Sequence, residues 1–308
     1  MTSNIKIKVI GVGGSGGNAL SRMKKTKVQG VQLIAINTDL QDLKKTKADL
    51  RLQIGRKITQ GLGTGMNPEI GKKAALESKN EIRETLQETD LIFITYGAGG
   101  GTGTGAGPVV AEIAKDLSIL TVAVITRPFS FEGQARKKAA DLGIKKLKEK
   151  VDSLIIISND KLLSILAPST PLWKAFWVCD DILRQAVQGI SDLITLPGII
   201  NVNFADIKGI IEKSGSALFG QGLARGERRA ETAARLAINS PLLDTTCKGA
   251  KGVLFNISGE DVGLSEIEEA AKVITKEINP EAKVIFGAIQ DEKLKKGQIK
   301  VAVIATGF

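Results

Sequence analysis

Short apolar runs alternate with amphipathic stretches along the first half of the chain. The runs have the length and β-branched composition of strands, and the stretches between them carry apolar residues at helical spacing. Strands are predicted in this half at 5–11, 31–36, 50–55, 90–96, 120–125 and 153–158. Strands separated by helices predict a parallel sheet, in which ligands bind at the carboxyl ends of the strands.

The second half has a different pattern. A helical stretch from Thr170 to about Ile194 is long for a globular helix, and an α+β arrangement follows it. Helices are predicted at 204–214, 227–238 and 265–278, strands at 253–257, 283–289 and 299–305, and a glycine-rich loop at 218–222. The chain is thus predicted to contain an α/β domain at 1–168, a linking helix at 169–198 and a smaller α+β domain at 199–308, whose sheet is mostly consecutive.

A glycine-rich stretch, 97–107, lies between a predicted strand and a predicted helix. Seven of its eleven residues are glycine, and its side chains larger than alanine are the hydroxyls of Thr102 and Thr104. Pro108 follows as the predicted first residue of the helix. Glycine lets a backbone approach a ligand closely, and N–H groups at a helix N-terminus bind anions. The stretch therefore predicts a site for a di- or triphosphate.

Two further glycine-rich loops follow predicted strands. The motif Gly11-x-Gly13-x-x-Gly16, with Asp39 downstream, matches the fingerprint of dinucleotide-binding folds and leaves an NAD-linked oxidoreductase as an alternative. The loop at 61–67 leads into a helix predicted over 68–86, with Asn67 as its cap and proline as its first residue. Several glycine-rich loops in one domain favour a single nucleotide bound by all of them over NAD. No lysine closes the 97–107 stretch, so it is not a Walker loop.

Composition narrows the function further. The chain of 308 residues has no histidine, which excludes Ser/His and Cys/His nucleophilic mechanisms and makes a zinc site improbable. Its two cysteines indicate no disulfide framework and fit a reducing cytoplasm. No apolar run reaches the length of a membrane span. The net charge is +10, but the lysines are interleaved with acids, which favours a solvated surface over a nucleic-acid site.

The run Gly99-Gly100-Gly101-Thr102-Gly103-Thr104-Gly105 resembles the signature of the tubulin/FtsZ superfamily. The resemblance to the FtsZ family extends from about Ile5 to the last residue and includes segments 11–18, 61–71, 126–133, 187–194 and 303–308. It implies the tubulin/FtsZ fold: a Rossmann-like GTPase domain with a parallel sheet, a long central helix and a C-terminal α+β domain. It also implies a self-polymerising GTPase of cell division, located in the cytoplasm at midcell.

The resemblance places the nucleotide on several loops. Glu132 and Arg136 are four residues apart and are therefore expected on one helix face. The resemblance implies that they contact the ribose and the nucleotide. The alternative is an ordinary ion pair on the surface. Phe176 can stack on a base. The carboxylate of Asp180 can accept from guanine N1–H and the 2-amino group, whereas adenine has an unprotonated N1; the alternative is a core Phe and a solvated Asp. The other implied contacts are Gly13, Gly14, Ser15, Gly16, Asn18, Gly65, Asn67, Gly99, Gly100, Gly101, Thr102, Gly103, Thr104, Gly105 and Pro128.

The catalytic segment departs from the family pattern. The family carries Asn-x-Asp-x-x-Asp after the central helix, and this chain has Asn201, Asn203 and Asp206 at those positions. The resemblance implies that this loop enters the nucleotide site of the next subunit and positions the attacking water. Asn203 holds water by hydrogen bonds but accepts no proton, so hydrolysis is expected to be slow. The alternative is a GTP-dependent filament protein whose hydrolytic site is nearly silent.

Cofactor and partners follow from the same resemblance. GTP or GDP with Mg²⁺ is expected, because no lysine offsets the phosphate charge. The implied partner is a second copy of the chain, added head to tail. The family continues beyond the position of Phe308 with a linker and a peptide that binds membrane adaptors, so the adaptors are expected without their usual binding peptide here. Whether that segment was trimmed or is lacking in this member stays open.

Overall fold

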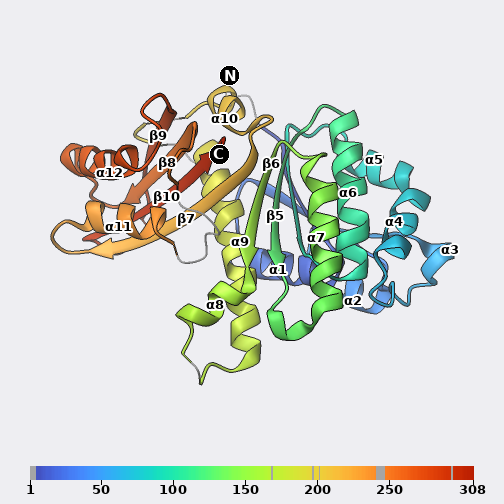
Figure 1. The fold of residues 1–308 in the computed structure, drawn as a ribbon. Coiled ribbons are helices and arrows are strands. Elements are labelled where there is room, and N and C mark those ends of the chain that lie inside the picture. Colours follow the sequence, from blue (N-terminus) through green and yellow to red (C-terminus); the bar gives the residue numbers. More distant parts are fainter. Residues whose placement is uncertain (1–4, 168, 196–197, 201, 241–246, 293) are drawn as a thin grey trace. The chain divides into compact units, whose positions relative to one another are not determined.

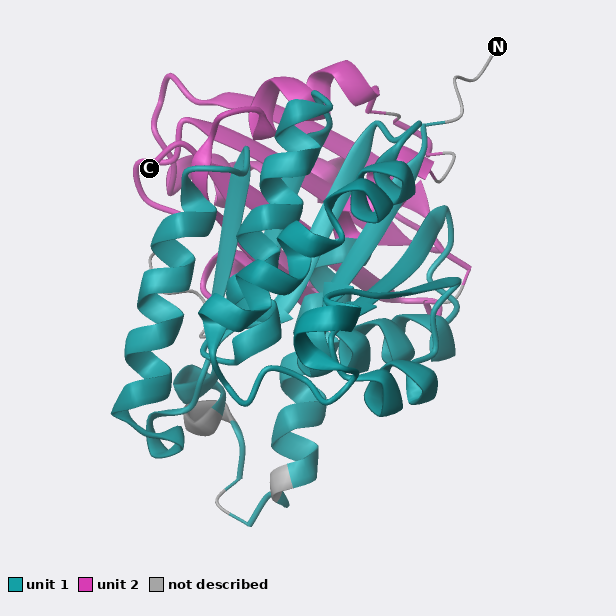
Figure 2. Ribbon diagram, turned by 90° about the vertical axis from the view of Figure 1, so that its right-hand side faces the viewer, with its two compact units in different colours: residues 1–188 teal, residues 189–308 magenta. Residues whose placement is uncertain are grey.

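The computed structural model describes residues 5–167, 169–195, 198–200, 202–240, 247–292 and 294–308. The chain divides into two compact units, Met1–Gln188 (unit 1) and Gly189–Phe308 (unit 2), which Figure 2 shows in teal and magenta. The boundary falls within α9 (Leu172–Thr195), a helix of 24 residues that matches the predicted long helix. Each unit has a hydrophobic core of its own.

Unit 1 is built on a parallel sheet, as predicted. Its strands are β1 (Ile7–Val12), β2 (Val31–Asn37), β3 (Leu50–Gln53), β4 (Leu91–Gly97), β5 (Leu120–Arg127) and β6 (Ser153–Ser158). They lie in the order β3-β2-β1-β4-β5-β6, and each adjacent pair is parallel. The order reverses direction between β1 and β4. In open sheets of this kind, ligands bind beside the carboxyl ends of the strands at such a reversal.

Helices cover this sheet, and most residues of its strands are buried; the exception is β3, at the edge of the sheet, in which no residue is buried. Figure 1 shows α4, α5, α6 and α7 together on one side of β5 and β6. The predicted helix over 68–86 is two helices, because the chain leaves helical geometry at Ser78. The helices are α1 (Gly13–Lys25), α2 (Leu40–Lys45), α3 (Arg56–Thr59), α4 (Pro68–Glu77), α5 (Lys79–Leu86), α6 (Gly101–Asp116), α7 (Gln134–Lys148) and α8 (Asn159–Ile165), with a 3₁₀ turn, η1, at Ser130–Glu132.

The glycine-rich stretch 97–107 is mostly helix rather than turn. Helix α6 begins at Gly101, so the prediction that Pro108 is its first residue is wrong. Gly99 is the residue of the stretch with positive φ, +94°. The later glycines serve packing: a Cβ on Gly105 would lie 1.9 Å from the carbonyl oxygen of Pro68 in α4. Glycine is therefore needed here because another backbone touches the helix, which local sequence patterns do not reveal.

Unit 2 contains a four-stranded mixed sheet in its described part. Its strands are β7 (Gly215–Arg225), β8 (Gly252–Gly259), β9 (Lys283–Gln290) and β10 (Gln298–Thr306). They lie in the order β7-β10-β8-β9, so the predicted consecutive order is wrong. Strand β10 is antiparallel to both of its neighbours, whereas β8 and β9 are parallel. The helices of this unit include α10 (Phe204–Ile211), α11 (Arg229–Ile238) and α12 (Leu264–Lys276).

Strand β7 replaces the loop that was predicted at 218–222. Gly220 and Gly222 lie inside the strand, where glycine is normally unfavourable. A Cβ on these residues would lie 1.9 Å from the carbonyl oxygen of Ala237 and 2.0 Å from that of Ala233, both in α11. The two glycines therefore let α11 pack directly on the strand, and their presence reflects a helix–sheet contact.

Candidate functional site

Two glycine-rich segments meet at the carboxyl ends of β1 and β4. The strands are paired in register, with Ile10 opposite Ile94, and each leads into a helix, α1 or α6. A Cβ on Gly13 would lie 3.1 Å from the backbone nitrogen of Gly103, so the N-termini of the two helices are close together. Unpaired N–H groups and the partial positive charge of both helix ends are thereby concentrated at one place.

Threonine hydroxyls converge beside these helix ends. Thr102 Oγ1 lies 2.7 Å from Thr38 Oγ1 and 3.4 Å from Thr64 Oγ1. Thr38 follows β2, and Thr64 comes from the loop before α4. Sequence reasoning missed Thr38 and Thr64. The signal for Thr38 was its place directly after a predicted strand, because the carboxyl ends of parallel strands share one edge of the sheet.

Two other hydroxyls hold the loops in shape. Thr104 Oγ1 accepts a hydrogen bond from the backbone N–H of Gly99 at 2.9 Å, and Thr104 is buried. Ser15 Oγ accepts from the N–H of Gly97 at 2.5 Å and so ties α1 to the end of β4. The Thr104 hydroxyl, one of the two in the predicted phosphate site, accepts from a loop amide and keeps its own O–H as a donor. Of the implied α1 residues, Gly14, Ser15 and Asn18 are exposed and Gly16 is buried.

The loop at 61–67 lies against the start of α6. A Cβ on Gly101 would lie 2.1 Å from Thr64 Oγ1 and 2.7 Å from the backbone nitrogen of Asn67. Asn67 caps α4 as predicted, accepting a bond from the N–H of Glu69 at 2.9 Å. Gly65 has a φ of +54°, and a Cβ added to it would have no neighbouring atom within 4 Å. The structure thus brings three glycine-rich loops of unit 1 to one edge of its sheet.

Glu132 and Arg136 form an ion pair, although they do not share a helix. Glu132 ends the 3₁₀ turn η1, whereas Arg136 lies in α7, which begins at Gln134. Arg136 Nη1 donates to Glu132 Oε2 at 2.8 Å, and Glu132 Oε1 accepts from the N–H of Phe129 at 2.8 Å. A Cβ on Gly99 would lie 2.7 Å from Arg136 Cγ, which places this pair beside the glycine-rich stretch. Pro128, also implied, is half-buried just after β5.

Asp180 and Phe176 lie on α9 within unit 1. Asp180 is buried, and its Oδ2 accepts from Arg22 Nε of α1 at 2.8 Å. Burial raises the pKa of the Asp180 carboxyl, and the Arg22 guanidinium opposes that rise. Phe176 is 39% exposed and packs edge-on against Phe129, with ring centroids 5.4 Å apart. Arg22 is a third residue that sequence reasoning missed, since 158 positions separate it from Asp180.

Asp39 is used locally. Its Oδ1 accepts from the N–H of Asp42 at 2.9 Å, so the side chain caps α2. Asp39 therefore has a structural role at the start of α2.

The predicted catalytic segment begins α10 in unit 2. Asn203 is exposed and caps this helix, because its Oδ1 accepts from the N–H of Asp206 at 2.8 Å. Asp206 is half-buried in the first turn. Asn201 lies outside the described residues. The Asn203 side chain is thus fixed as the cap, and the Asp206 carboxylate lies in the first turn, where the helix dipole favours a negative charge.

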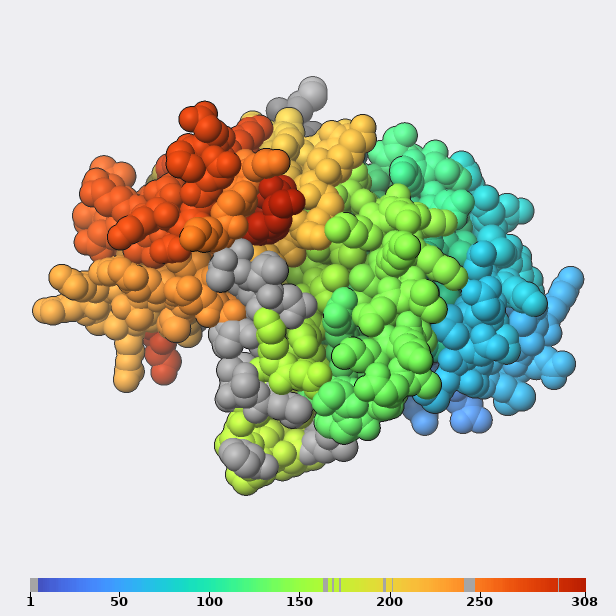
Figure 3. Space-filling model, in the orientation of Figure 1, coloured from blue at the N-terminus to red at the C-terminus, as the bar shows by residue number. Residues whose placement is uncertain are grey.

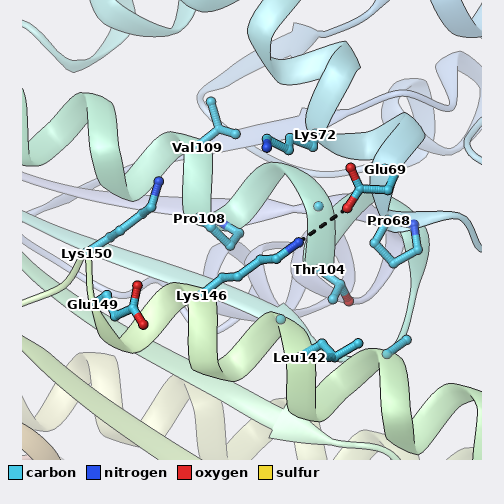
Figure 4. Close-up of a pocket in the computed structure, with 13 residues that line it drawn as sticks. Pro68, Glu69, Lys72, Thr104, Pro108, Val109, Leu142, Lys146, Glu149 and Lys150 are labelled. Atoms are coloured by element: carbon cyan, nitrogen blue, oxygen red, sulfur yellow. Dashed lines mark hydrogen bonds and ion pairs between the residues drawn. The ribbon is translucent and has the colours of Figure 1, made fainter.

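A cavity of about 510 Å³ lies on unit 1 between α4, α6 and α7. Figure 4 shows Lys146 of α7 reaching toward Glu69 of α4, at 3.3 Å, and the same face of unit 1 is visible in Figure 3. Thr104 borders the cavity, and a Cβ on Gly143 would lie 2.3 Å from Thr104 Cγ2. Thr104 therefore links the packing of α7 to the loop amide of Gly99.

In the described part of the chain, no three His, Cys, Asp or Glu side chains gather in the way a metal ion requires. No helix there has the length and apolar character to cross a bilayer.

Comparisons with known proteins agree with this geometry. Residues 6–167 match the tubulin/FtsZ family, GTPase domain, and residues 215–308 match the FtsZ family, C-terminal domain. The chain is 46% identical to an empty FtsZ dimer structure from M. jannaschii, with a TM-score of 0.93, covering 98% of this chain and 88% of that one. It shares its fold with a GTPγS-bound CetZ2 protofilament from Haloferax volcanii, at 21% identity and a TM-score of 0.82. The match covers 98% of this chain and 92% of that one. A GDP-bound CetZ1 monomer from the same organism is 20% identical with a TM-score of 0.85, covering 99% and 94%.

Proposed function

Because the chain belongs to the FtsZ family, we propose that it binds GTP on the loops of unit 1 and assembles head to tail into filaments. GTP is hydrolysed slowly where the α10 segment of one subunit meets the nucleotide of the next. The filament acts in the cytoplasm at the division site. The observation that supports this most directly is the meeting of the α1 and α6 N-termini with the Thr38–Thr64–Thr102 hydroxyls at one sheet edge.

Guanine is the base that this site favours. A carboxylate at Asp180 accepts from guanine N1–H and the 2-amino group together, and adenine offers no donor at N1. Phe176 supplies an aromatic face nearby, since it lies one helical turn before Asp180. The remaining implied contacts, among them Asn18, Asn67 and Pro128, lie in or beside the loops and helix N-termini that we expect around the nucleotide.

Mg²⁺ fits this site as a partner of the nucleotide rather than of a protein cage. The described residues offer hydroxyls at the place where we expect the phosphates, and no cluster of three or more carboxylates. Mg²⁺ keeps several waters and commonly enters on phosphate oxygens, where it neutralises their charge. Thr102 and Thr64 are the side chains we expect beside it.

Gly143→Ala is expected to weaken GTP binding about fivefold, although Gly143 lies in α7 and outside the loops. The new Cβ would force Thr104 to rotate and lose its bond to Gly99 N–H, a loss of about 1 kcal/mol. Titration calorimetry with GTP measures the effect. Thr104→Val, which removes the same hydroxyl, should reproduce it. Weak binding in Gly143→Ala with normal binding in Thr104→Val would contradict this role of Thr104.

Asn203→Asp is expected to raise the GTPase rate on the order of tenfold, because it adds a second carboxylate that can accept a proton. The fold should not change, since Asp caps a helix as well as Asn and also suits the helix dipole. Phosphate release is measured against protein concentration, with light scattering alongside.

Asn203→Ser is the matched control, because serine keeps a cap and adds no carboxylate. It should leave the rate low. In all three proteins, turnover should begin at the concentration where scattering begins, as expected if two subunits complete the site. An equal or lower rate in Asn203→Asp would show that Asn203 does not limit hydrolysis. Scattering without phosphate release in any of them would favour the alternative of a filament protein with a silent site.

A further inference from the structure

Arg22 is tied to the proposed base site by two contacts that the nucleotide-binding assignment leaves unexplained. Its Nε donates to Asp180 Oδ2 at 2.8 Å. Its guanidinium carbon lies 5.6 Å from the centroid of the Trp177 ring. Trp177 and Asp180 are three residues apart on α9, so both contacts of Arg22 come from the same face of that helix.

We propose that Arg22 is a positioning residue for guanine specificity, which it confers by keeping the Asp180 carboxylate ionised and oriented toward the base. This inference rests on the proposed function, because it requires that Asp180 reads guanine. Arg22 itself does not touch the nucleotide in this proposal. It acts through the Asp180 carboxylate, which contacts the base.

The geometry allows Asp180 to serve Arg22 and guanine together. An ionised carboxylate has about four acceptor positions on its two oxygens. Arg22 Nε uses one position on Oδ2. Both oxygens therefore keep acceptor capacity for the N1–H and 2-amino donors of guanine. The Arg22 bond also fixes the plane of the carboxylate, which a bidentate contact with a planar base requires.

Burial makes this support necessary. The Asp180 side chain is 12% exposed, and a buried carboxylate without a cationic partner tends to take up a proton. The protonated form has an O–H that would face the N1–H of guanine, donor against donor. Loss of Arg22 would thus remove both the charge and the acceptor that select guanine over adenine.

The charged groups around Asp180 predict a pH effect. Arg22 from α1 lowers the pKa of the Asp180 carboxyl, whereas burial and the neighbouring Asp181 raise it. Asp181 is itself paired with Arg184, at 2.6 Å. Without Arg22 the pKa of Asp180 must rise further, so Asp180 becomes protonated at a higher pH. GTP affinity should then begin to fall, as pH is lowered, at a higher pH in Arg22→Gln than in the wild-type protein.

The test compares Arg22→Gln with Arg184→Gln, a control that removes a similar ion pair from the adjacent residue of α9. Dissociation constants are measured for GTP, ITP and ATP; ITP keeps N1–H and lacks the 2-amino group. Arg22→Gln should lose on the order of tenfold to a hundredfold in GTP affinity, with a smaller loss for ATP. Arg184→Gln should keep the wild-type preference. Arg22→Lys, which restores the charge without the planar guanidinium, should recover part of the loss.

Trp177 provides an independent readout. The chain has two tryptophans, so Trp173→Phe leaves Trp177 as the single reporter of the Arg22 contact. In that background, Arg22→Gln should change the Trp177 emission, while Arg184→Gln should not. Thermal unfolding shows whether each variant is folded. If Arg22→Gln does not fold, Arg22→Lys takes its place in the test.

The outcomes separate this inference from the proposed function. If the wild-type protein does not prefer GTP over ATP, the proposed function is wrong and the inference falls with it. If the wild-type protein prefers GTP and Arg22→Gln keeps that preference, the inference alone is wrong. An equal loss of affinity for all three nucleotides would also overturn it, because it would show that Arg22 supports the fold or the phosphates rather than base selection.

Discussion

Asp206→Asn is expected to lower the GTPase rate by a factor of roughly 10² to 10⁴, the usual contribution of a positioned proton-transfer group. Asp206 is the single carboxylate left in the segment, because Asn203 stands at the position of the other acid. The substitution keeps the size of the side chain, and the bond from the Asp206 N–H to Asn203 Oδ1 is a backbone contact that persists. Phosphate release is measured above the concentration at which filaments scatter light.

Glu212→Gln is the matched control, since it neutralises a carboxylate at the opposite end of the same helix, α10. It should retain turnover. GTP binding and light scattering should survive in Asp206→Asn, because the nucleotide loops lie in the other unit. Full turnover in Asp206→Asn would mean that another group positions the water. Loss of GTP binding would mean that this segment supports the fold rather than the chemistry.

Gly105→Ala is expected to destabilise the protein by about 3 kcal/mol or more, at the upper end of overpacking effects. Its Cβ would lie 1.9 Å from the carbonyl oxygen of Pro68 and 2.7 Å from the nitrogen of Lys72, both backbone atoms of α4. Helix propensity alone predicts the opposite sign, because alanine is favoured over glycine by about 1 kcal/mol in a helix. Thermal unfolding followed by circular dichroism therefore separates the two effects by sign.

Gly209→Ala in α10 is the control for that experiment. The nearest atom to its Cβ position is Lys283 Nζ at 2.9 Å, the end of a flexible side chain that can move away. This variant should be as stable as the wild-type protein or more stable. If Gly105→Ala also gains stability, the close contact between α4 and α6 does not limit the choice of residue. A large loss in both variants would show that both helices tolerate only glycine.

Strand positions in unit 1 could be predicted because they depend on local patterns. Runs such as 90–96 are apolar on both faces, as a strand covered by helices on both sides must be. The cap at Asn67 and the first-turn proline of α4 were likewise predictable, since both follow from the chemistry of a few adjacent residues. The chain order of strands in unit 2 was not, because β10 lies between β7 and β8 through long-range pairing.

The residues of the candidate site also divide into those that the sequence predicted and those that it did not. The glycine-rich stretch pointed to a phosphate site because its composition is so unusual, and its resemblance to a known signature supplied the implied contacts. Thr64 and Arg22 could not be found from spacing, and the signal for Thr38 was its place after a predicted strand. The three residues reach the site from a loop, α1 and β2, and only the folded chain brings them to Thr102 and Asp180.

By itself the sequence determined the parallel sheet of unit 1, the long helix α9, the family and the absence of histidine chemistry, because these depend on composition, periodicity and motif. Tertiary structure alone decided what several of the glycines do. Gly105 and Gly222 look like loop residues along the chain, yet each lies within a regular element and faces the backbone of a neighbouring helix. The requirement for glycine comes from an atom distant in sequence, and local patterns contain no information about that atom.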